Sequence, residues 1–266
     1  MSLSTSKKRK LLLASGMKLL CTMLIVPAHA TVFFTEEFNG TTLDPAWAEL
    51  GDNGHTGLTG SGAYVLTDPH GNPGTELRRD PLDGPSSFRA SIVLAADPFN
   101  SAPSLADPSS NNTRSDFKWR FFGPNGFAEV VLNSFGDMRL YHRDSRTGAN
   151  GNVAPNTRIG VADGDTLELL LSYSLAADTV DLSYSLNGDA AVSFYSGSGN
   201  GDGFGDFASN FMDAQVFKWG STPTDQAVIA IDRWSVVPEP SVFGLIAIGM
   251  SGLLPRRRRK ASGKVA

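Results

Sequence analysis

The carboxylates of this chain are the residues with the clearest capacity for chemistry, and their spacing limits the reaction they could catalyse. Glycoside hydrolysis needs two carboxyl groups that face one cleft, about 5–9 Å apart depending on the mechanism. Between residues 31 and 237 the glutamates stand singly or as one adjacent pair: Glu36, Glu37, Glu49, Glu76, Glu129 and Glu168. Adjacent residues point to opposite faces of a strand, and the isolated Glu129 and Glu168 are expected to face solvent. The spacing therefore predicts no catalytic residue and no enzyme activity.

Histidine chemistry has no better support. None of His55, His70 and His142 stands beside a Gly-x-Ser-x-Gly turn, which would mark an activated serine. The three histidines are also too scattered to indicate a zinc site. We therefore expect neither serine-type hydrolysis nor zinc catalysis.

Sugar binding needs an exposed aromatic side chain with polar groups beside it. Core packing is the expected role of the four tryptophans, Trp47, Trp119, Trp219 and Trp234. Tyr141 and Arg143 share the strand face opposite Met138 and Leu140, so they are predicted to point outward. They are the residues that we expect to contact a ligand.

The elements that must position these side chains are strands. Apolar and polar residues alternate with period two along Leu167–Leu175 and Val180–Leu186, and helical periodicity is absent between residues 31 and 237. Asn187-Gly188 predicts a two-residue type I′ turn into a third strand near Ala190–Tyr195, which makes a meander. Further strands are expected at 32–38, 63–67, 86–95, 115–122, 127–133, 137–142, 215–218 and 227–236. So many short strands without helices predict an all-β, two-sheet antiparallel jelly-roll sandwich.

The charge of the predicted sandwich is strongly acidic. The whole chain has a formal charge of −4, but both of its ends are basic. Residues 31–237 hold 12 cations and 26 carboxylates, a net charge of −14. This balance is typical of a soluble exported domain and argues against nucleic acid and anionic membranes as partners. The length suits a single large all-β domain.

Three segments of the predicted sandwich resemble the concanavalin A-like lectin and glucanase jelly roll, close to its laminin G-like branch. Residues 36–47, Glu-Glu-Phe-Asn-Gly followed by Leu-Asp-Pro-Ala-Trp, resemble the first strand and following turn of such domains. The meander around Leu186-Asn187-Gly188 resembles their central hairpins, and Ile229–Val236 resembles their last strand. The resemblance implies that the last strand pairs beside the first.

The same resemblance bears on metal binding and on catalysis. Related sandwiches often hold a structural Ca²⁺ between their first and last strands, which implies Glu36 or Glu37 together with Asp232 as ligands. Segments 199–206 and 163–165 are alternative calcium loops, although such segments are more often simple turns. Glucanases of this fold carry Glu-x-Asp-x-Glu or Glu-x-Asp-x-x-Glu on one strand, and neither spacing occurs here.

The N-terminal segment has the three parts of a secretory signal peptide. Lys7–Lys10 are basic, Leu11–Val26 is mainly apolar, and Ala28-His29-Ala30 fits the small-x-small cleavage rule. Residues 1–30 are therefore expected to be removed after export, with cleavage guided by Ala28 and Ala30. The only cysteine of the chain, Cys21, lies inside this leader, so no disulfide is expected in the mature protein.

The C-terminal segment, residues 238–260, combines three ordered elements before the tail 261–266. Pro238-Glu239-Pro240 precedes the apolar run Val242–Leu254, and a basic end follows at Arg256, Arg257, Arg258, Arg259 and Lys260. A helix over these 13 apolar residues would reach only about 20 Å, against a bilayer core about 30 Å thick. The basic end favours a cytoplasmic terminus. The segment is therefore a marginal, transient transmembrane helix; an ordinary membrane anchor is the alternative.

These three elements resemble the PEP-CTERM sorting signal of exported proteins in Gram-negative bacteria that make exopolysaccharide. The resemblance implies recognition by an exosortase, which would cut near Pro238–Pro240. We expect an exported protein of the cell surface or extracellular matrix, held in the membrane before processing. Its sandwich is expected to bind polysaccharide without catalysis. The alternatives are a structural or adhesion module that contacts proteins, and a diverged glycoside hydrolase.

Overall fold

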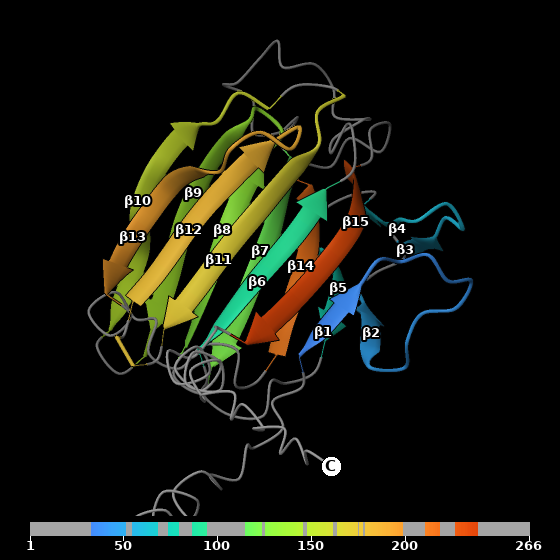
Figure 1. Ribbon diagram of the computed structural model, residues 1–266, viewed down its shortest axis with the longest axis horizontal. Helices are drawn as coiled ribbons and strands as arrows, with labels where there is room; N and C mark the ends of the chain where they lie inside the picture. Colours follow the sequence, from blue (N-terminus) through green and yellow to red (C-terminus); the bar gives the residue numbers. More distant parts are fainter. Residues whose placement is uncertain are drawn as a thin grey trace, which may run out of the picture. The chain divides into compact units, whose positions relative to one another are not determined.

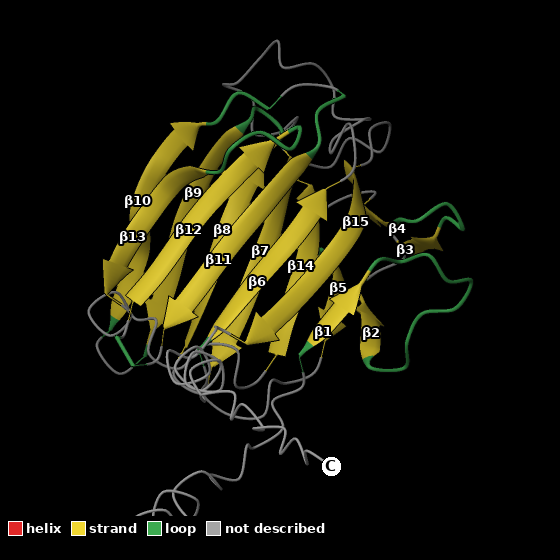
Figure 2. Ribbon diagram, viewed as in Figure 1, coloured by secondary structure: helices red, strands yellow, loops and turns green. Residues whose placement is uncertain are grey.

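The structure, a computed structural model, describes residues 33–51, 55–68, 74–79, 87–94, 115–123, 126–145, 148–161, 164–174, 176–177, 179–198, 211–218 and 227–238. Within these ranges the chain forms strands and no helix. The strands make two antiparallel sheets, one in front of the other in Figure 1 and drawn in one colour in Figure 2. The predicted all-β, two-sheet antiparallel sandwich is confirmed for this part of the chain.

One sheet has eight strands in the order β13-β12-β11-β6-β15-β4-β3, with β1 paired beside β15. In chain order these strands are β1 (Phe34–Glu36), β3 (His55–Leu58), β4 (Tyr64–Asp68), β6 (Phe88–Leu94), β11 (Leu167–Ser174), β12 (Thr179–Leu186), β13 (Val192–Ser198) and β15 (Ala227–Pro238). The predicted meander is therefore the β11-β12-β13 edge of this sheet. The first strand pairs with the last, as the resemblance implied, with Phe34 opposite Val236.

The other sheet has seven strands in the order β10-β9-β8-β7-β14-β5-β2. In chain order these are β2 (Trp47–Leu50), β5 (Thr75–Arg79), β7 (Ser115–Gly123), β8 (Gly126–Asn133), β9 (Asp137–Asp144), β10 (Ala149–Arg158) and β14 (Phe211–Lys218). β7 lies at its centre, between β8 and β14, and both of these neighbours pair with β7 along their full length. This sheet carries the candidate site.

The turn between β12 and β13 has the predicted geometry. Asn187 and Gly188 have φ angles of 54° and 77°, the two left-handed residues that a type I′ turn requires. The Asn187 side chain accepts a hydrogen bond from the Thr166 amide at 3.0 Å and donates one to Asp165 at 2.7 Å. Asp165, part of one alternative calcium loop, therefore serves this turn.

The core lies between the sheets and follows from strand alternation. Phe117, Trp119 and Phe121 of β7 point inward and are fully buried, as are Leu169 and Leu167 of β11. Burying an aromatic or leucine side chain contributes about 1.5–3 kcal/mol, so this alternation fixes which side of each strand remains outside. Trp47, Trp119 and Trp234 are all buried, which confirms core packing for three tryptophans; Trp219 lies outside the described residues.

An aromatic cluster closes the sandwich where its first and last strands meet. The Trp47 ring lies 5.1 Å from that of Trp234 and 5.4 Å from that of Phe34, centroid to centroid. The predicted signal peptide, residues 1–30, and the chain beyond Pro238 lie outside the described residues. Among the described residues, no helix is long and apolar enough to cross a membrane.

Candidate functional site

A row of aromatic side chains crosses the outer face of the seven-stranded sheet. Phe211 of β14, Phe122 of β7 and Phe127 of β8 are successive cross-strand partners. Their ring centroids are 4.2 and 5.4 Å apart, and Tyr141 of β9 continues the row at 6.0 Å from Phe127. All four rings are only partly buried. Because paired strands lie about 4.8 Å apart, one aromatic residue per strand produces a continuous apolar strip, here called the aromatic row.

Polar groups stand at both ends of the aromatic row. At one end the Arg78 guanidinium lies 3.9 Å above the Phe211 ring, a cation–π contact. At the other end the Tyr141 hydroxyl donates to the Asn150 side chain, and Arg143 is exposed. Tyr141 and Arg143 therefore point outward, on the face that the sequence predicted for a ligand contact.

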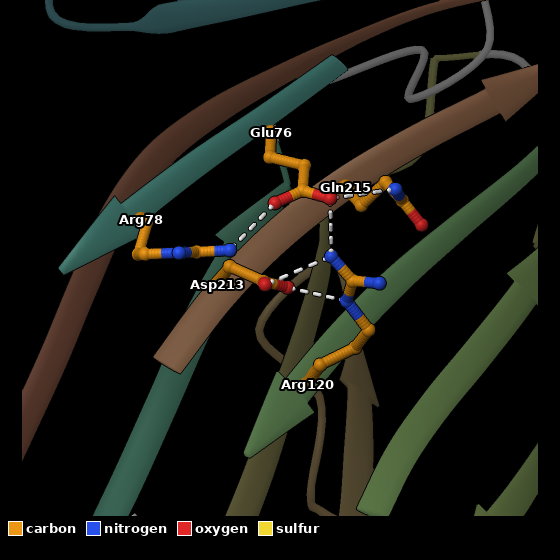
Figure 3. Close-up of polar contacts among 5 residues, drawn as sticks. All are labelled: Glu76, Arg78, Arg120, Asp213 and Gln215. Carbon is orange, nitrogen blue, oxygen red and sulfur yellow. Dashed lines mark hydrogen bonds and ion pairs between the residues drawn. The ribbon is translucent and has the colours of Figure 1, made fainter. Parts of the chain in front are cut away.

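A network of charged side chains lies beside the aromatic row (Figure 3). Arg120 of β7 donates to both carboxylate oxygens of Asp213 on β14, at 2.6 and 2.8 Å. The same guanidinium contacts Glu76 of β5 at 2.8 Å. Glu76 also accepts a hydrogen bond from Gln215 at 3.0 Å and pairs with Arg78 at 3.2 Å. Three strands are thus cross-linked by one buried guanidinium, with bidentate geometry toward Asp213.

Burial changes the proton affinity of two carboxyls on this face. The side chain of Asp213 has no exposed surface, and burial raises its pKa to about 6, with the Arg120 charge partly offsetting the shift. Glu129 of β8 is only 8% exposed, and burial raises its pKa too, against the opposing charges of Lys118, Arg120 and Arg139. The expectation that Glu129 faces solvent is therefore wrong, because neighbouring outward side chains cover it. The Glu168 side chain is 29% exposed and pairs with Arg233 at 3.1 Å, so it reaches solvent as predicted.

The chemistry of this face favours binding. Glu76 and Asp213 share Arg120 as a partner, so both carboxyls are engaged as acceptors and neither is positioned as a free acid or base. What remains accessible is the aromatic row, with guanidinium donors and the side chain of Asn150 at its ends. Apolar rings flanked by polar groups are the ordinary means of holding a sugar.

The outer face of the eight-stranded sheet differs in character. Ser91 and Ser235 lie side by side on β6 and β15 with their hydroxyls 2.9 Å apart. Further serines on β11 and β12 continue this polar surface: Ser172, Ser174 and Ser183. Such a face has few groups on which a sugar ring could pack.

The proposed calcium ligands are brought together only in part. Glu37 and Asp232 line one open depression of about 370 Å³, together with Asn39, Ser61 and Arg233. Glu36 turns away, because its carboxylate accepts hydrogen bonds from the Phe38 amide at 3.0 Å and the Trp47 indole at 3.4 Å. Among the described residues no three His, Cys, Asp or Glu side chains are grouped to hold a metal.

The depression nevertheless has a donor set of the right chemistry for Ca²⁺. Its side chains supply two carboxylates, an amide oxygen and a hydroxyl, and Ca²⁺ takes six to eight oxygens, including carbonyls and water. Arg233 is drawn toward Glu168, which reduces the competition between its charge and a cation. Segment 199–206, the other calcium candidate, lies outside the described residues.

The residues assigned to export and sorting also lie outside the described part, apart from Pro238. They are Ala28, Ala30, Glu239, Pro240, Arg256, Arg257, Arg258 and Arg259. Pro238 is the last residue of β15 and is exposed. The described part of β15 therefore reaches the first residue of the Pro-Glu-Pro segment.

The described strands form a two-sheet β-sandwich, a fold also seen in solved lectin and glucanase structures. No protein-family model matches the sequence, and no curated protein matches it. The structural similarity is therefore the informative comparison, and at identities below 15% it shows the fold alone.

Three solved structures illustrate this class. The endo-1,3-beta-glucanase from Streptomyces sioyaensis has a TM-score of 0.51 at 12% identity, over 78% of this chain and 95% of that one. Lectin I-B4 from Griffonia simplicifolia has a TM-score of 0.51 at 11% identity, over 78% and 99%. The GH43 BlXynB protein from Bacillus licheniformis has a TM-score of 0.51 at 14% identity, over 77% of this chain. The chain spans only 39% of the length of that GH43 protein.

Proposed function

We propose that this protein is an exported, exosortase-processed component of the cell envelope or extracellular matrix, whose β-sandwich binds polysaccharide without cleaving it. The aromatic row is the observation that carries the binding proposal. Four partly exposed rings in line across four adjacent strands form an apolar strip long enough for more than one sugar unit. The ordinary place for such rings in a soluble sandwich is the core, so their position outside favours a ligand.

The fold supports a glycan as the ligand class. The similar structures include a protein named as an endo-1,3-beta-glucanase and one named as a lectin. Both names concern carbohydrate, and both proteins share this sandwich over most of their length. Nucleic acid and anionic membrane surfaces remain disfavoured by the acidic charge of residues 31–237.

The absence of catalysis is supported by the use of the carboxylates. Glu76 and Asp213 are both paired with Arg120, which leaves neither free to protonate a glycosidic oxygen. A diverged glycoside hydrolase is the second candidate, favoured by the raised pKa of Asp213 and of Glu129 on one face, a property of general acids. The polar serine face supports the third reading, a module that contacts proteins.

The test is a glycan array probed with the purified protein, followed by two variants. Phe127→Ala with Tyr141→Ala should weaken glycan binding at least about tenfold, because each lost aromatic contact contributes on the order of 1 kcal/mol. Leu170→Ala, a half-exposed apolar residue on the eight-stranded sheet, is the matched control and should bind normally. No binding to any glycan by a folded sample would move the function to protein contact. Release of reducing sugar, lost on Asp213→Asn, would establish hydrolysis instead.

We also propose a structural Ca²⁺ between Glu37 and Asp232. The open depression and its oxygen donors support this assignment. Such an ion would neutralise two carboxylates in an acidic protein and would link the start of the sandwich to its last strand. It would not take part in sugar binding through the aromatic row, which belongs to the other sheet.

A further inference from the structure

On the outer face of the seven-stranded sheet, several acidic side chains are buried, whereas basic side chains reach solvent. The side chains of Asp116 and Asp213 and of Glu129 are buried, at 0%, 0% and 8% exposure. The cations of the same face reach solvent: Arg143 is exposed, and Lys118 and Arg139 are partly exposed. Two other carboxylates of this face, Glu76 and Asp137, are partly exposed, but both are paired with arginines. Among the described residues, the charged groups of this face that reach solvent without such a partner are therefore positive, although residues 31–237 as a whole carry a charge of −14.

Among the described residues, the exposed cations of this face have no carboxylate within ion-pair distance. Arg120 and Arg78 are held by Asp213 and Glu76. Lys118, Arg139 and Arg143, in contrast, make no ion pair in the described part of the chain. Glu129 interacts electrostatically with Lys118 and Arg139, and burial raises its pKa against these charges. The Nε–H of Arg139 is also buried without an acceptor among the described residues.

The free cations flank the aromatic row. Arg139 and Arg143 lie two residues before and after Tyr141 on the outward face of β9, so they are roughly 13 Å apart along the strand. Cross-strand pairing places Arg143 beside Phe127, and it places Lys118 and Arg139 on either side of Val131. One extended chain lying on the aromatic row can therefore contact a ring and at least two of these cations at once.

We propose that the polysaccharide bound by this face is acidic: a chain with carboxylate or sulfate groups, as in polyuronates and sulfated glycans. This inference rests on the proposed function, since it concerns the same face. The sugar rings pack on Phe122, Phe127 and Tyr141, and the anionic groups pair with Arg139, Arg143 and Lys118. Guanidinium groups hold carboxylates and sulfates with two parallel hydrogen bonds. The acidic remainder of the protein repels diffuse polyanions such as DNA, so selection depends on short-range contact at this face.

The experiment compares matched neutral and acidic probes by isothermal titration of the purified protein. Polygalacturonate and dextran sulfate represent the two anionic groups, and dextran and laminarin are neutral. We expect at least about tenfold tighter binding of one acidic probe than of both neutral ones, weakened as NaCl rises from 50 to 300 mM through screening. Arg139→Gln with Arg143→Gln should remove most of that preference, whereas Arg139→Lys with Arg143→Lys should retain part of it. Arg89→Gln, an exposed arginine on the eight-stranded sheet, is the control and should leave binding unchanged.

The outcomes separate this inference from the proposed function. Equal or tighter binding of laminarin or dextran would overturn the acidic ligand while leaving glycan binding intact. Silence on all four probes and on the glycan array would remove both. Binding of duplex DNA as tight as that of polygalacturonate would overturn recognition of an acidic glycan in favour of general anion binding. The salt dependence of the unmodified protein decides the matter if the variants do not fold.

Discussion

Arg120 is the cation that pairs with two carboxylates of the outer face. It joins β7 to β14 through Asp213 and to β5 through Glu76, so one guanidinium compensates carboxylates from two strands. A buried ion pair contributes little net stability, yet leaving one partner unpaired costs several kcal/mol. We therefore infer that the network mainly fixes the side chains of β5, β7 and β14 beside the aromatic row in one arrangement.

Asp213 should make folding stability depend on pH. Its pKa in the folded chain is raised to about 6, above the value near 3.9 of an unfolded chain. Between these values the folded form holds a proton that the unfolded form has lost. The stabilising contribution of the neutral carboxyl is thus complete below about pH 4 and is lost as the pH rises through 6. Relative to Asp213→Asn, which cannot ionise, the unmodified protein should lose on the order of 2 kcal/mol across this range.

Urea unfolding at pH 4, 5, 6 and 7 measures this difference. Asp181→Asn is the matched control, because Asp181 is exposed on the eight-stranded sheet and should give no such trend. A variant that becomes less stable relative to the unmodified protein as the pH rises would mean that the attraction of Arg120 outweighs burial, and the assigned direction of the pKa would be wrong.

At the scale of elements, the strands with clear alternation were predictable and the charged ones were not. Strands β9 and β11 alternate cleanly, so Tyr141 and Arg143 could be assigned to the outer face from sequence. β5 reads Thr-Glu-Leu-Arg-Arg, with Leu77 as its only large apolar residue, and it was not predicted; nor were β2, β3 and β10. β14 was expected to begin at Gln215 but begins at Phe211.

These omissions explain why most of the site was missed. Glu76 and Arg78 lie on β5, and Phe211 and Asp213 on the unpredicted start of β14. The charged residues among these suggest a loop, because a lone charged side chain is normally solvated. In the folded protein, side chains of neighbouring strands compensate these charges. Such pairing depends on the tertiary structure and cannot be read from the local sequence. The alternation of Thr75, Leu77 and Arg79 with Glu76 and Arg78 was the available signal. Phe122 and Phe127 lay on predicted strands, but their alignment depends on strand register, which no short motif specifies.

Calcium should act on the junction of the first and last strands. β1 is only three residues long and is fixed by pairing with β15, next to the depression that holds Glu37 and Asp232. An ion that binds only the folded state stabilises it by RT ln(1 + [L]/Kd). We expect millimolar Ca²⁺ to raise the melting temperature by a few degrees over EDTA, and Asp232→Asn to abolish the increase.

Differential scanning fluorimetry with Ca²⁺, Mg²⁺ and EDTA provides the measurement. Asp181→Asn serves again as the control, since it removes one carboxylate of β12 far from this junction in the strand order. An equal melting temperature in Ca²⁺ and EDTA would exclude a stabilising calcium site. If Asp232→Asn keeps the increase, Asp232 is not a ligand, and segment 199–206 becomes the next candidate.

At the scale of the whole molecule, the two ends of the chain are basic and the sandwich between them is acidic. Residues 1–30 and 238–260 are basic, as the proposed signal peptide and sorting signal require for export and transient membrane retention. On the outer face of the seven-stranded sheet of the sandwich, the described charged groups that reach solvent without an ion-pair partner are cations. An acidic exterior favours solubility, and in our proposal the cationic face is the surface that binds an acidic polysaccharide.

The Pro-Glu-Pro segment and the basic end of the chain can be tested by mutation in the producing bacterium. β15 runs to Pro238, the first residue of Pro-Glu-Pro, and we propose that an exosortase cuts the chain near this segment. In the producing bacterium, Glu239→Ala or removal of Arg256–Arg259 should leave a heavier, unprocessed chain in the inner membrane. Ser262→Ala, in the tail beyond the basic end, should be processed normally. Mass spectrometry of membrane and released fractions measures this. Normal mass and release of both altered chains would exclude an exosortase signal, and stable retention of the unmodified protein would make the segment a plain anchor.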